Sequence, residues 1–462
     1  MIRHAKVRSD RVNNPCITDG AAASQSKHRS KVSLKGNLNS LRSFATLIVL
    51  SMGGGITYIL PYLSSYFYIP MKQAMHIDNM QIGLMGSAMG FTAMVFYWPG
   101  GWIADRFSPR KLIGFSLIAN ALLGLWLATI PSFAVLLAIQ LTMGVFLTLT
   151  YWSAMIKMVR LLARSDQQGR YFGILEGGRN VTTVVFVAAG LSLFDWLGSS
   201  TSGLRWTIVF FSALVMAIGL LSWALLPESI AVVANVPNDK TSMPLLEAIR
   251  RVMRIPAVWL AMLIILCAYV TSVGTGYLTP YATDVYKQSV VFGGVLSMIV
   301  QSTGIFAPPL AGLVADRWTT SSTILRLMAV LALCLLLFVI IPGGPHLFLL
   351  LLINSIAIGC VFYALRGIYF ALLEEGAVPA ELTGTATGLI SLVAFTPDVF
   401  VPALGGHLLD RYGAGGLGYR YFFLVLALFA IAGIGLTLLF RRVVSVNPAR
   451  TVSGHREGAY VS

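Results

Sequence analysis

The sequence predicts an all-α membrane protein of about twelve transmembrane helices, arranged as two parallel repeats of six helices each. Of its 462 residues, 56% are hydrophobic and only 11% are charged, too few charges to cover a soluble surface. Apolar segments long enough to cross a bilayer as a helix of about 20 residues follow one another along the chain. A charged turn at residues 101–111 also recurs in reduced form about 211 residues later, which indicates a duplicated chain.

Twelve apolar segments qualify as spans, six on each side of a long polar connector. The first half holds Leu41–Tyr66, Ile82–Ala104, Lys111–Ile130, Phe133–Met155, Tyr171–Leu197 and Leu204–Leu226. The second half holds Ala257–Tyr281, Val291–Ala315, Thr323–Ile341, Leu347–Leu373, Thr385–Leu409 and Tyr419–Phe440. We therefore expect a basic tail (1–40), an N-terminal six-helix lobe (41–227), a central loop (228–256), a C-terminal six-helix lobe (257–442) and a second tail (443–462).

The two halves share landmarks at a constant offset. Three residues of the fifth span answer three of the eleventh: Gly173, Gly190 and Asp195 correspond to Gly388, Gly405 and Asp410. Because six is an even number of spans, both halves cross the membrane in the same direction. Parallel six-span repeats of this kind are one of the architectures of secondary transporters.

The basic residues are distributed unevenly about the predicted spans. With the N-terminus inside, 26 of the 33 Lys and Arg residues fall in inside segments, five in outside loops and two within spans. This asymmetry predicts that both tails and the central loop are cytosolic. It also explains the net charge of +15 without nucleic acid. We interpret the N-terminal tail as a retained, solvated arm and not a signal peptide, with binding to anionic lipid as the alternative.

The charged turn is Gly101-Trp102-Ile103-Ala104-Asp105-Arg106-Phe107-Ser108-Pro109-Arg110-Lys111, and its reduced copy keeps Gly312, Asp316 and Arg317. The pattern of a Gly, an Asp-Arg pair four residues later and two closing bases resembles the loop between the second and third spans of the major facilitator superfamily. The resemblance covers the chain from about Leu41 to Arg442. The Asp-Arg-x-Ser-Pro-Arg form is similar to the loop of organophosphate antiporters and their uncharacterised permease relatives.

The resemblance implies a two-lobed transporter in which this turn is a conformational latch. A carboxylate at Asp105 suits the partially positive N-terminus of a neighbouring helix, and bases suit the anionic inner leaflet. The cargo of the phosphate antiporters is not carried over, because those proteins place an Arg at depth in the first and seventh spans, whereas here Arg42 lies at the cytosolic mouth of the first and the seventh has no base. Nitrate permeases likewise place an Arg in their second and eighth spans, which this chain lacks.

Ionisable residues within spans are costly at bilayer depth and therefore mark candidate sites. Glu176 and Arg179 lie at i, i+3 spacing on one face of the fifth span, with Asn180 beside them. They form either a structural ion pair or a pair in which the cargo or a proton competes for one partner.

Asp398 lies near the middle of the eleventh span, between Pro397 and Pro402, which should bend that helix. A single carboxylate at this depth is our first candidate for proton coupling. The alternative is a structural cap for freed amides, or a fixed ion pair.

Arg366 lies in the tenth span, and Glu374 and Glu375 follow at its cytosolic end. The corresponding end of the fourth span carries Lys157 and Arg160. Opposite charges on helix ends related by the repeat suggest an inside gate of ion pairs that closes when the transport pathway faces out. The alternative is that the bases extend to lipid headgroups.

Four aromatic residues lie in spans that line the pathway in the family that the chain resembles: Tyr151, Trp152, Tyr277 and Tyr363. Aromatic rings with a polar tip suit a polar organic cargo, and packing is the alternative.

From these observations we expect a monomeric, multi-pass protein of the cytoplasmic (inner) membrane with both termini in the cytosol. It would move a small polar organic solute, anions included, by alternating access, coupled to protons or by exchange. A transporter-derived sensor that signals through a cytosolic partner is the alternative. We expect no enzyme activity, cofactor or metal site, because no nucleophile constellation or metal-ligand spacing occurs within the spans.

Overall fold

The computed structural model describes residues 43–162, 168–228, 245–341, 343–379, 382–413 and 416–445. Nearly all of these residues are helical, and none of them lies in a strand. Eleven helical segments are long and apolar enough to cross a membrane, and a shorter apolar helix, Ser43–Ile56, precedes them. The prediction of an all-α protein with many membrane spans is confirmed. The tail at 1–40 and most of the loop and of the tail at 443–462 lie outside the described residues.

The first predicted span is broken. The helix Ser43–Ile56 is followed by a turn at 57–63 and then by α2 (Ser64–Met75), so helical structure extends nine residues beyond the predicted end at Tyr66. A left-handed residue, His76, ends α2, and Asp78 begins α3 by forming a capping box with Gln81.

The rest of the N-terminal lobe consists of α3 (Asn79–Arg106), α4 (Pro109–Leu127), α5 (Phe133–Val145), η1 (Phe146–Trp152), α6 (Ser153–Leu162), α7 (Gln168–Trp196) and α8 (Thr201–Leu225). Pro109 occupies the first turn of α4, where its missing N–H costs nothing. The segment η1 is a π-helix within the fourth span. Such segments shift the side chains that follow relative to a regular α-helix.

The central loop contains a short helix, α9 (Leu245–Met253). The C-terminal lobe then consists of α10 (Pro256–Gly274), η3 (Thr275–Tyr277), α11 (Leu278–Asp284), α12 (Val290–Ser302), η4 (Thr303–Ile305), α13 (Ala307–Arg317), α14 (Thr320–Ile340), η5 (Pro345–Leu347), α15 (Phe348–Ile368), η6 (Tyr369–Ala371), α16 (Leu372–Glu375), α17 (Thr383–Ala394), α18 (Pro397–Tyr412) and α19 (Leu417–Ser445). The eleventh span breaks between Ala394 and Pro397, as the prolines predicted.

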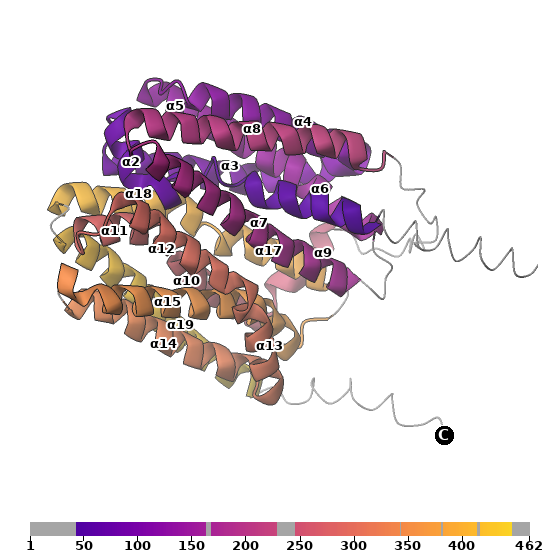
Figure 1. Ribbon diagram of the computed structural model, residues 1–462. Helices are drawn as coiled ribbons and strands as arrows, with labels where there is room; N and C mark the ends of the chain where they lie inside the picture. The colour runs from indigo at the N-terminus through magenta and orange to yellow at the C-terminus, as the bar shows by residue number, and fades with distance from the viewer. Residues whose placement is uncertain are drawn as a thin grey trace, which may run out of the picture.

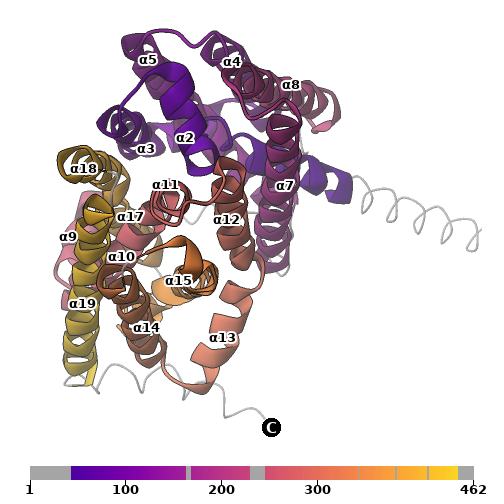
Figure 2. The ribbon, with the colours of Figure 1, turned by 60° about the vertical axis from the view of Figure 1, so that its left-hand side comes forward.

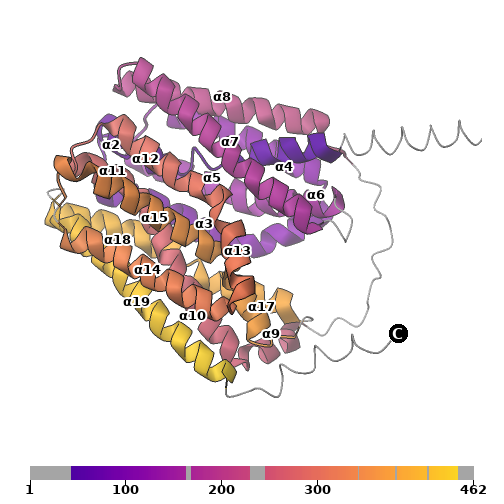
Figure 3. The same cartoon turned by 60° about the horizontal axis from the view of Figure 1, so that its bottom comes forward.

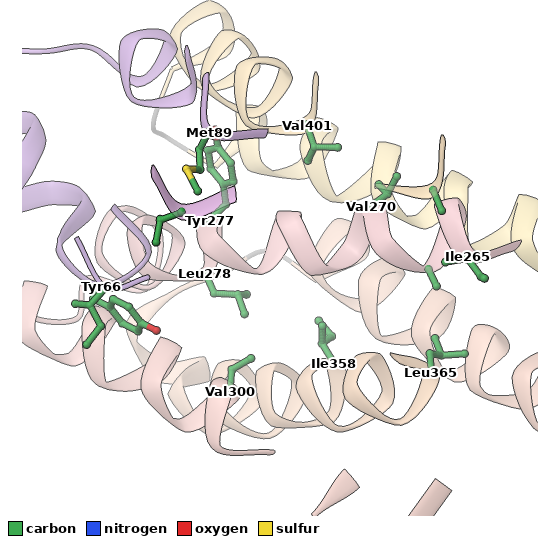
Figure 4. Packing of buried hydrophobic residues seen from close by; sticks show 14 of the residues in the cluster. Tyr66, Met89, Ile265, Val270, Tyr277, Leu278, Val300, Ile358, Leu365 and Val401 are labelled. Atoms are coloured by element: carbon green, nitrogen blue, oxygen red, sulfur yellow. The ribbon is translucent and has the colours of Figure 1, made fainter. Parts of the chain in front are cut away.

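The two lobes lie side by side, the indigo-to-magenta half against the salmon-to-yellow half (Figure 1). They meet through α3 and α18, α2 and α12, α2 and α11, and α7 and α12. Figures 1 and 3 show that α2 and α11 lie at one end of the bundle, while α6, α13 and α17 lie toward the other. Figure 2, in which the left-hand side of Figure 1 has come forward, shows α2 and α11 close together. Figure 4 shows part of the buried packing, with Tyr66, Tyr277 and Val300 among the labelled side chains.

Glycines allow the lobes to meet closely at the end that holds α2 and α11, which we call the closed end. A Cβ atom on Gly83 would lie 2.2 Å from the carbonyl oxygen of Pro402, and one on Gly406 would lie 2.2 Å from that of Asn79. Only glycine permits backbones to approach this closely. At the opposite end, which we call the open end, α3 ends at Arg106 and α4 begins at Pro109.

The open end lacks these close contacts. A Cβ atom on four of its glycines would meet no atom within 4 Å: Gly101, Gly173, Gly384 and Gly388. The helices that carry them belong to both lobes, and among the described residues every side-chain hydrogen bond between lobes lies at the closed end. The lobes are therefore joined at one end and separated at the other.

Candidate functional site

At the closed end, a carboxylate of the C-terminal lobe accepts hydrogen bonds from the N-terminus of a helix of the N-terminal lobe. Asp410, near the end of α18, accepts hydrogen bonds from the backbone N–H of Met80 (2.7 Å), the side-chain amide of Asn79 (2.7 Å) and the backbone N–H of Asn79 (3.3 Å). The side-chain oxygen of Asn79 in turn accepts from Lys72 and Tyr68. A carboxylate at the N-terminus of α3 is also favoured by the helix dipole.

Two further hydrogen bonds join the lobes at this end. Thr279 donates its hydroxyl to the carbonyl of Ser65 (2.5 Å), and Tyr66 donates to the side-chain oxygen of Gln301 (3.2 Å). No comparable bond joins the lobes at the open end among the described residues.

Between the two ends lies a group of polar and aromatic side chains from both lobes, which we call the central cluster. The charge of Arg366 in the C-terminal lobe acts on Tyr58 of the N-terminal lobe, and that of Arg179 in the N-terminal lobe acts on Tyr363 of the C-terminal lobe. Its members are Tyr58, Tyr62, Tyr97, Trp152, Glu176, Arg179, Tyr269, Tyr363, Arg366 and Asp398.

Arg179 is fully engaged by its own lobe. Its guanidinium forms an ion pair with Glu176 (2.6 Å) and donates to the carbonyl of Gly54 (3.2 Å). It also lies over the rings of Trp152 and Tyr58, at 5.1 and 5.6 Å from their centroids. The predicted i, i+3 contact between Glu176 and Arg179 is therefore present, and Trp152 reaches it from the π-helix.

Tyr363 belongs to the central cluster, whereas Asn180, Tyr151 and Tyr277 are engaged elsewhere. Asn180 donates to the carbonyl of Glu176, one turn back in its own helix. Tyr151 is fully buried and Tyr277 is 5% exposed, so neither lines an open space in this conformation. The Tyr277 hydroxyl donates to the carbonyl of Pro402 (2.5 Å), which assigns this residue to the packing of the closed end.

Asp398 stands in the first turn of α18, directly after the break in the eleventh span. Its carboxylate accepts a hydrogen bond from the Tyr269 hydroxyl of α10 at 2.9 Å. Its backbone lies against Gly90 of α3, where a Cβ atom would come within 2.4 Å. Asp398 thus marks the last close contact between α3 and the eleventh span before the lobes separate.

Arg366, in the last turn of α15, is exposed. Its charge acts on Tyr363, Tyr269 and Asp398, yet it makes no hydrogen bond or ion pair among the described residues. The cluster therefore contains one compensated arginine and one uncompensated arginine.

The charged turn lies at the open end, with its described side chains bound within the N-terminal lobe. Arg106 stacks on Trp102 (3.6 Å), and Lys111 pairs with Glu228 at the end of the sixth span (3.2 Å). Ser108 donates to the carbonyl of Glu228, and Arg110 lies in the first turn of α4. In the reduced copy, Gly312 and Arg317 lie in α13. The side chains of Asp105 and Asp316 lie outside the described part of the chain.

The residues of the predicted inside gate contact their own lobes. Lys157 donates to the carbonyl of Ala104 (2.5 Å), while Glu375 accepts from the backbone N–H (2.7 Å) and the hydroxyl of Ser321 in the first turn of α14. Arg160 and Glu374 are exposed. No ion pair between these two groups is found among the described residues, and pairing in a conformation closed at this end stays a prediction.

Sequence reasoning missed several residues of the site. Asp410 was identified only as a repeat landmark, although its charge at the end of a span was a usable signal. Tyr269 stands among apolar residues and gave no signal of its own, because its partner Asp398 is 129 positions away. Tyr58, Tyr62 and Tyr97 were likewise indistinguishable from packing residues.

In the described ranges, no three His, Cys, Asp or Glu side chains converge as a metal site.

The comparisons with known proteins agree with the fold. The chain is 30% identical over 407 residues to the inner membrane protein YqcE of Escherichia coli (strain K12), covering 87% of this chain and 94% of that protein. It is 28% identical over 418 residues to the inner membrane protein YihN of the same organism, with 87% and 96% covered.

Among solved structures, the chain superposes on a bacterial homologue of the human lysosomal transporter Spinster, in an inward-facing and unoccupied conformation, with a TM-score of 0.72. The match covers 88% of this chain and 98% of the other at 14% identity, which shows the fold alone. The sequence model of the Major Facilitator Superfamily matches residues 43–397, most of the chain. The chain therefore belongs to the Major Facilitator Superfamily.

Proposed function

We propose that the protein is a secondary active transporter that moves a small polar organic solute, anions included, by alternating access. The observation that carries this proposal is a cluster of ionisable and aromatic side chains between two lobes that are joined at only one end. Ionisable groups at membrane depth are costly unless they serve a pathway. The glycine contacts of α3 with α18 form a surface on which the lobes can rock, as in other transporters built from repeats.

We propose further that the closed end faces outward and that the protein resides in the cytoplasmic (inner) membrane as a monomer. The distribution of Lys and Arg supports cytosolic termini and an open end that faces the cytosol. The names of the two Escherichia coli relatives support the inner membrane.

Asp398 is the proposed proton-coupling residue, and the Glu176–Arg179 pair is proposed to shape the pathway. Asp398 lies where the lobes part, so its charge state can act on both the solute space and the contact with α3. Exchange of one solute for another is the second mode of coupling that we propose to test.

The test is transport by purified protein in liposomes with an imposed pH gradient and a panel of sugars, carboxylates and phosphate esters. We expect a solute that accumulates against its gradient, together with proton movement reported by a pH-sensitive dye. Asp398→Asn should abolish accumulation, while the same change at an exposed aspartate of α7, Asp195→Asn, should retain it. Accumulation by Asp398→Asn at the wild-type level would exclude the assigned role, and wild-type protein that moves no solute would refute the function itself.

A further inference from the structure

The two arginines of the central cluster differ in what they have left to bind. Arg179 forms an ion pair with Glu176 at 2.6 Å, donates a hydrogen bond to the carbonyl of Gly54 and lies over two aromatic rings. Arg366 is exposed and makes no hydrogen bond or ion pair among the described residues. An arginine that projects into accessible space with all its donors unused is a ready anion site.

The carboxylates near Arg366 do not satisfy it. Glu176 and Asp398 are both near enough to interact electrostatically with Arg366, but Glu176 already pairs with Arg179, and Asp398 accepts from Tyr269. We therefore propose, as a refinement that rests on the proposed function, that Arg366 binds the anionic group of the cargo and that the cargo is a hydroxylated organic monoanion.

The charge of the cluster limits the cargo to a single negative charge. The cluster holds two arginines and two carboxylates, so it is neutral when Asp398 is ionised. A bound monoanion adds one negative charge, which one proton on Asp398 cancels. Net charge at membrane depth is unfavourable, so a neutral cluster in both the empty and loaded forms lets the lobes rock without a large electrostatic cost. A dianion would need a second uncompensated cation, which the described cluster does not offer.

Asp398 faces a defined set of groups in this scheme. Tyr269 of α10 donates to it and the charge of Arg366 of α15 acts on it, while its own charge acts on Tyr62 of the turn at 57–63 and Tyr97 of α3. Because Arg366 and Asp398 share this environment, an anion on Arg366 weakens the stabilisation that Arg366 gives to the Asp398 carboxylate. Binding of the anion and of the proton should therefore favour each other.

Tyrosine hydroxyls explain why the monoanion should carry hydroxyl groups. Four tyrosines of the cluster feel the charge of Arg366, and their hydroxyls make no hydrogen bond among the described residues: Tyr58, Tyr62, Tyr97 and Tyr363. None of these hydroxyls is among the fully buried, unpaired atoms of the described chain, so each is still available for a new hydrogen bond. Each can donate to and accept from a cargo hydroxyl while its ring packs against the carbon skeleton.

The test is binding to purified full-length protein, followed by isothermal calorimetry, using probes that share a carbon skeleton but differ in charge. D-Gluconate and a panel of shorter hydroxylated monocarboxylates are compared with D-glucose and D-glucose 6-phosphate. We expect a monocarboxylate to bind at least tenfold more tightly than the neutral and dianionic probes. Arg366→Gln should weaken that binding by about 10- to 100-fold, as expected for loss of a charged hydrogen-bonding partner. The matched control Arg205→Gln, an exposed arginine on α8, should have no effect.

A second measurement reports on the site without a cargo. Phenylglyoxal labelling followed by mass spectrometry should modify Arg366 faster than Arg179, and the best monocarboxylate should slow labelling of Arg366. Binding of no monocarboxylate in the panel, equal binding of the neutral probe, or unchanged binding by Arg366→Gln would each overturn the inference. Uptake of a neutral solute that does not depend on Arg366 would refute the monoanion while leaving the transporter proposal intact.

Discussion

The carboxylate of Asp410 lies on the N-terminus of α3, 2.7 Å from the side-chain amide of Asn79 and 2.7 Å from the backbone N–H of Met80. This contact joins the end of the eleventh span to the start of the second. The latch that the resemblance implies for Asp105 would act at the other end of the second span.

Loss of the Asp410 carboxylate should favour opening of the closed end. A hydrogen bond to a charged group contributes about 1.5–3 kcal/mol when buried. Asp410 is exposed, so we expect Asp410→Ala to shift the equilibrium by only about three- to tenfold. Alkylation of a cysteine placed at Ser65, which lies in the contact between α2 and α11, measures the opening.

The matched control for this experiment is Asp195→Ala. Asp195 occupies the position in α7 that answers Asp410, but it is exposed and its side chain makes no hydrogen bond or ion pair among the described residues. Equal alkylation rates in Asp410→Ala and Asp195→Ala would show that the contact does not hold the lobes together.

Gly406→Ala should act in the same direction by a steric route. Its Cβ atom would lie 2.2 Å from the carbonyl oxygen of Asn79, so the two helices would have to move apart. Overpacking of this kind costs about 1–3 kcal/mol, enough to change the equilibrium by roughly tenfold. Gly435→Ala in α19, where a Cβ atom meets nothing within 4 Å, is the control and should transport normally. A Gly406→Ala protein with unaltered alkylation and transport would show that the contact is not required.

The sequence predicted the fold well because membrane spans are determined locally. Apolar length and the distribution of bases need no tertiary information, and Pro397 and Pro402 predicted a bend in the eleventh span, which the structure shows as a break before Pro397. The contacts between lobes could not be derived in this way. Asn79 and Asp410 are 331 positions apart, and neither residue indicates which helix end it will meet.

The same limit applies to the site. Spacing within one helix predicted the contact of Glu176 with Arg179, because residues three apart share a face. Spacing could not distinguish Arg179, whose charge is balanced by an ion pair with Glu176, from Arg366, which has no ion pair among the described residues. It also could not show that Tyr151 packs under Gly53, since that depends on how the first and fourth spans meet.

Asp105→Asn should impair transport without impairing insertion. We expect the latch at residues 101–111 to act in the conformation that is closed at the present open end, where Gly101 now has free space around it. Loss of the carboxylate would then destabilise that conformation and slow uptake severalfold, while expression and thermal stability of the detergent-solubilised protein stay near the wild-type values. Normal uptake rates at normal expression would count against the latch. Asp78→Asn, a change of the same kind in the exposed capping box of α3, serves as the control.

Tyr269→Phe tests whether Asp398 must be held in place by its hydrogen bond, because this variant removes that bond and keeps the carboxylate. The substitution removes the hydroxyl that donates to the Asp398 carboxylate at 2.9 Å but keeps the ring packed against Phe395, at a centroid distance of 4.7 Å. We expect proton-driven accumulation to persist, because the carboxylate is still present. The initial rate of uptake should fall by about tenfold, because the carboxylate no longer has the hydrogen bond that fixes its position.

Asp398→Asn, in contrast, should lose accumulation but retain downhill exchange of labelled solute. The two variants are compared in the same liposomes by measuring accumulation and exchange in parallel. Identical losses in both assays for both variants would mean that Tyr269 and Asp398 act only as a structural pair.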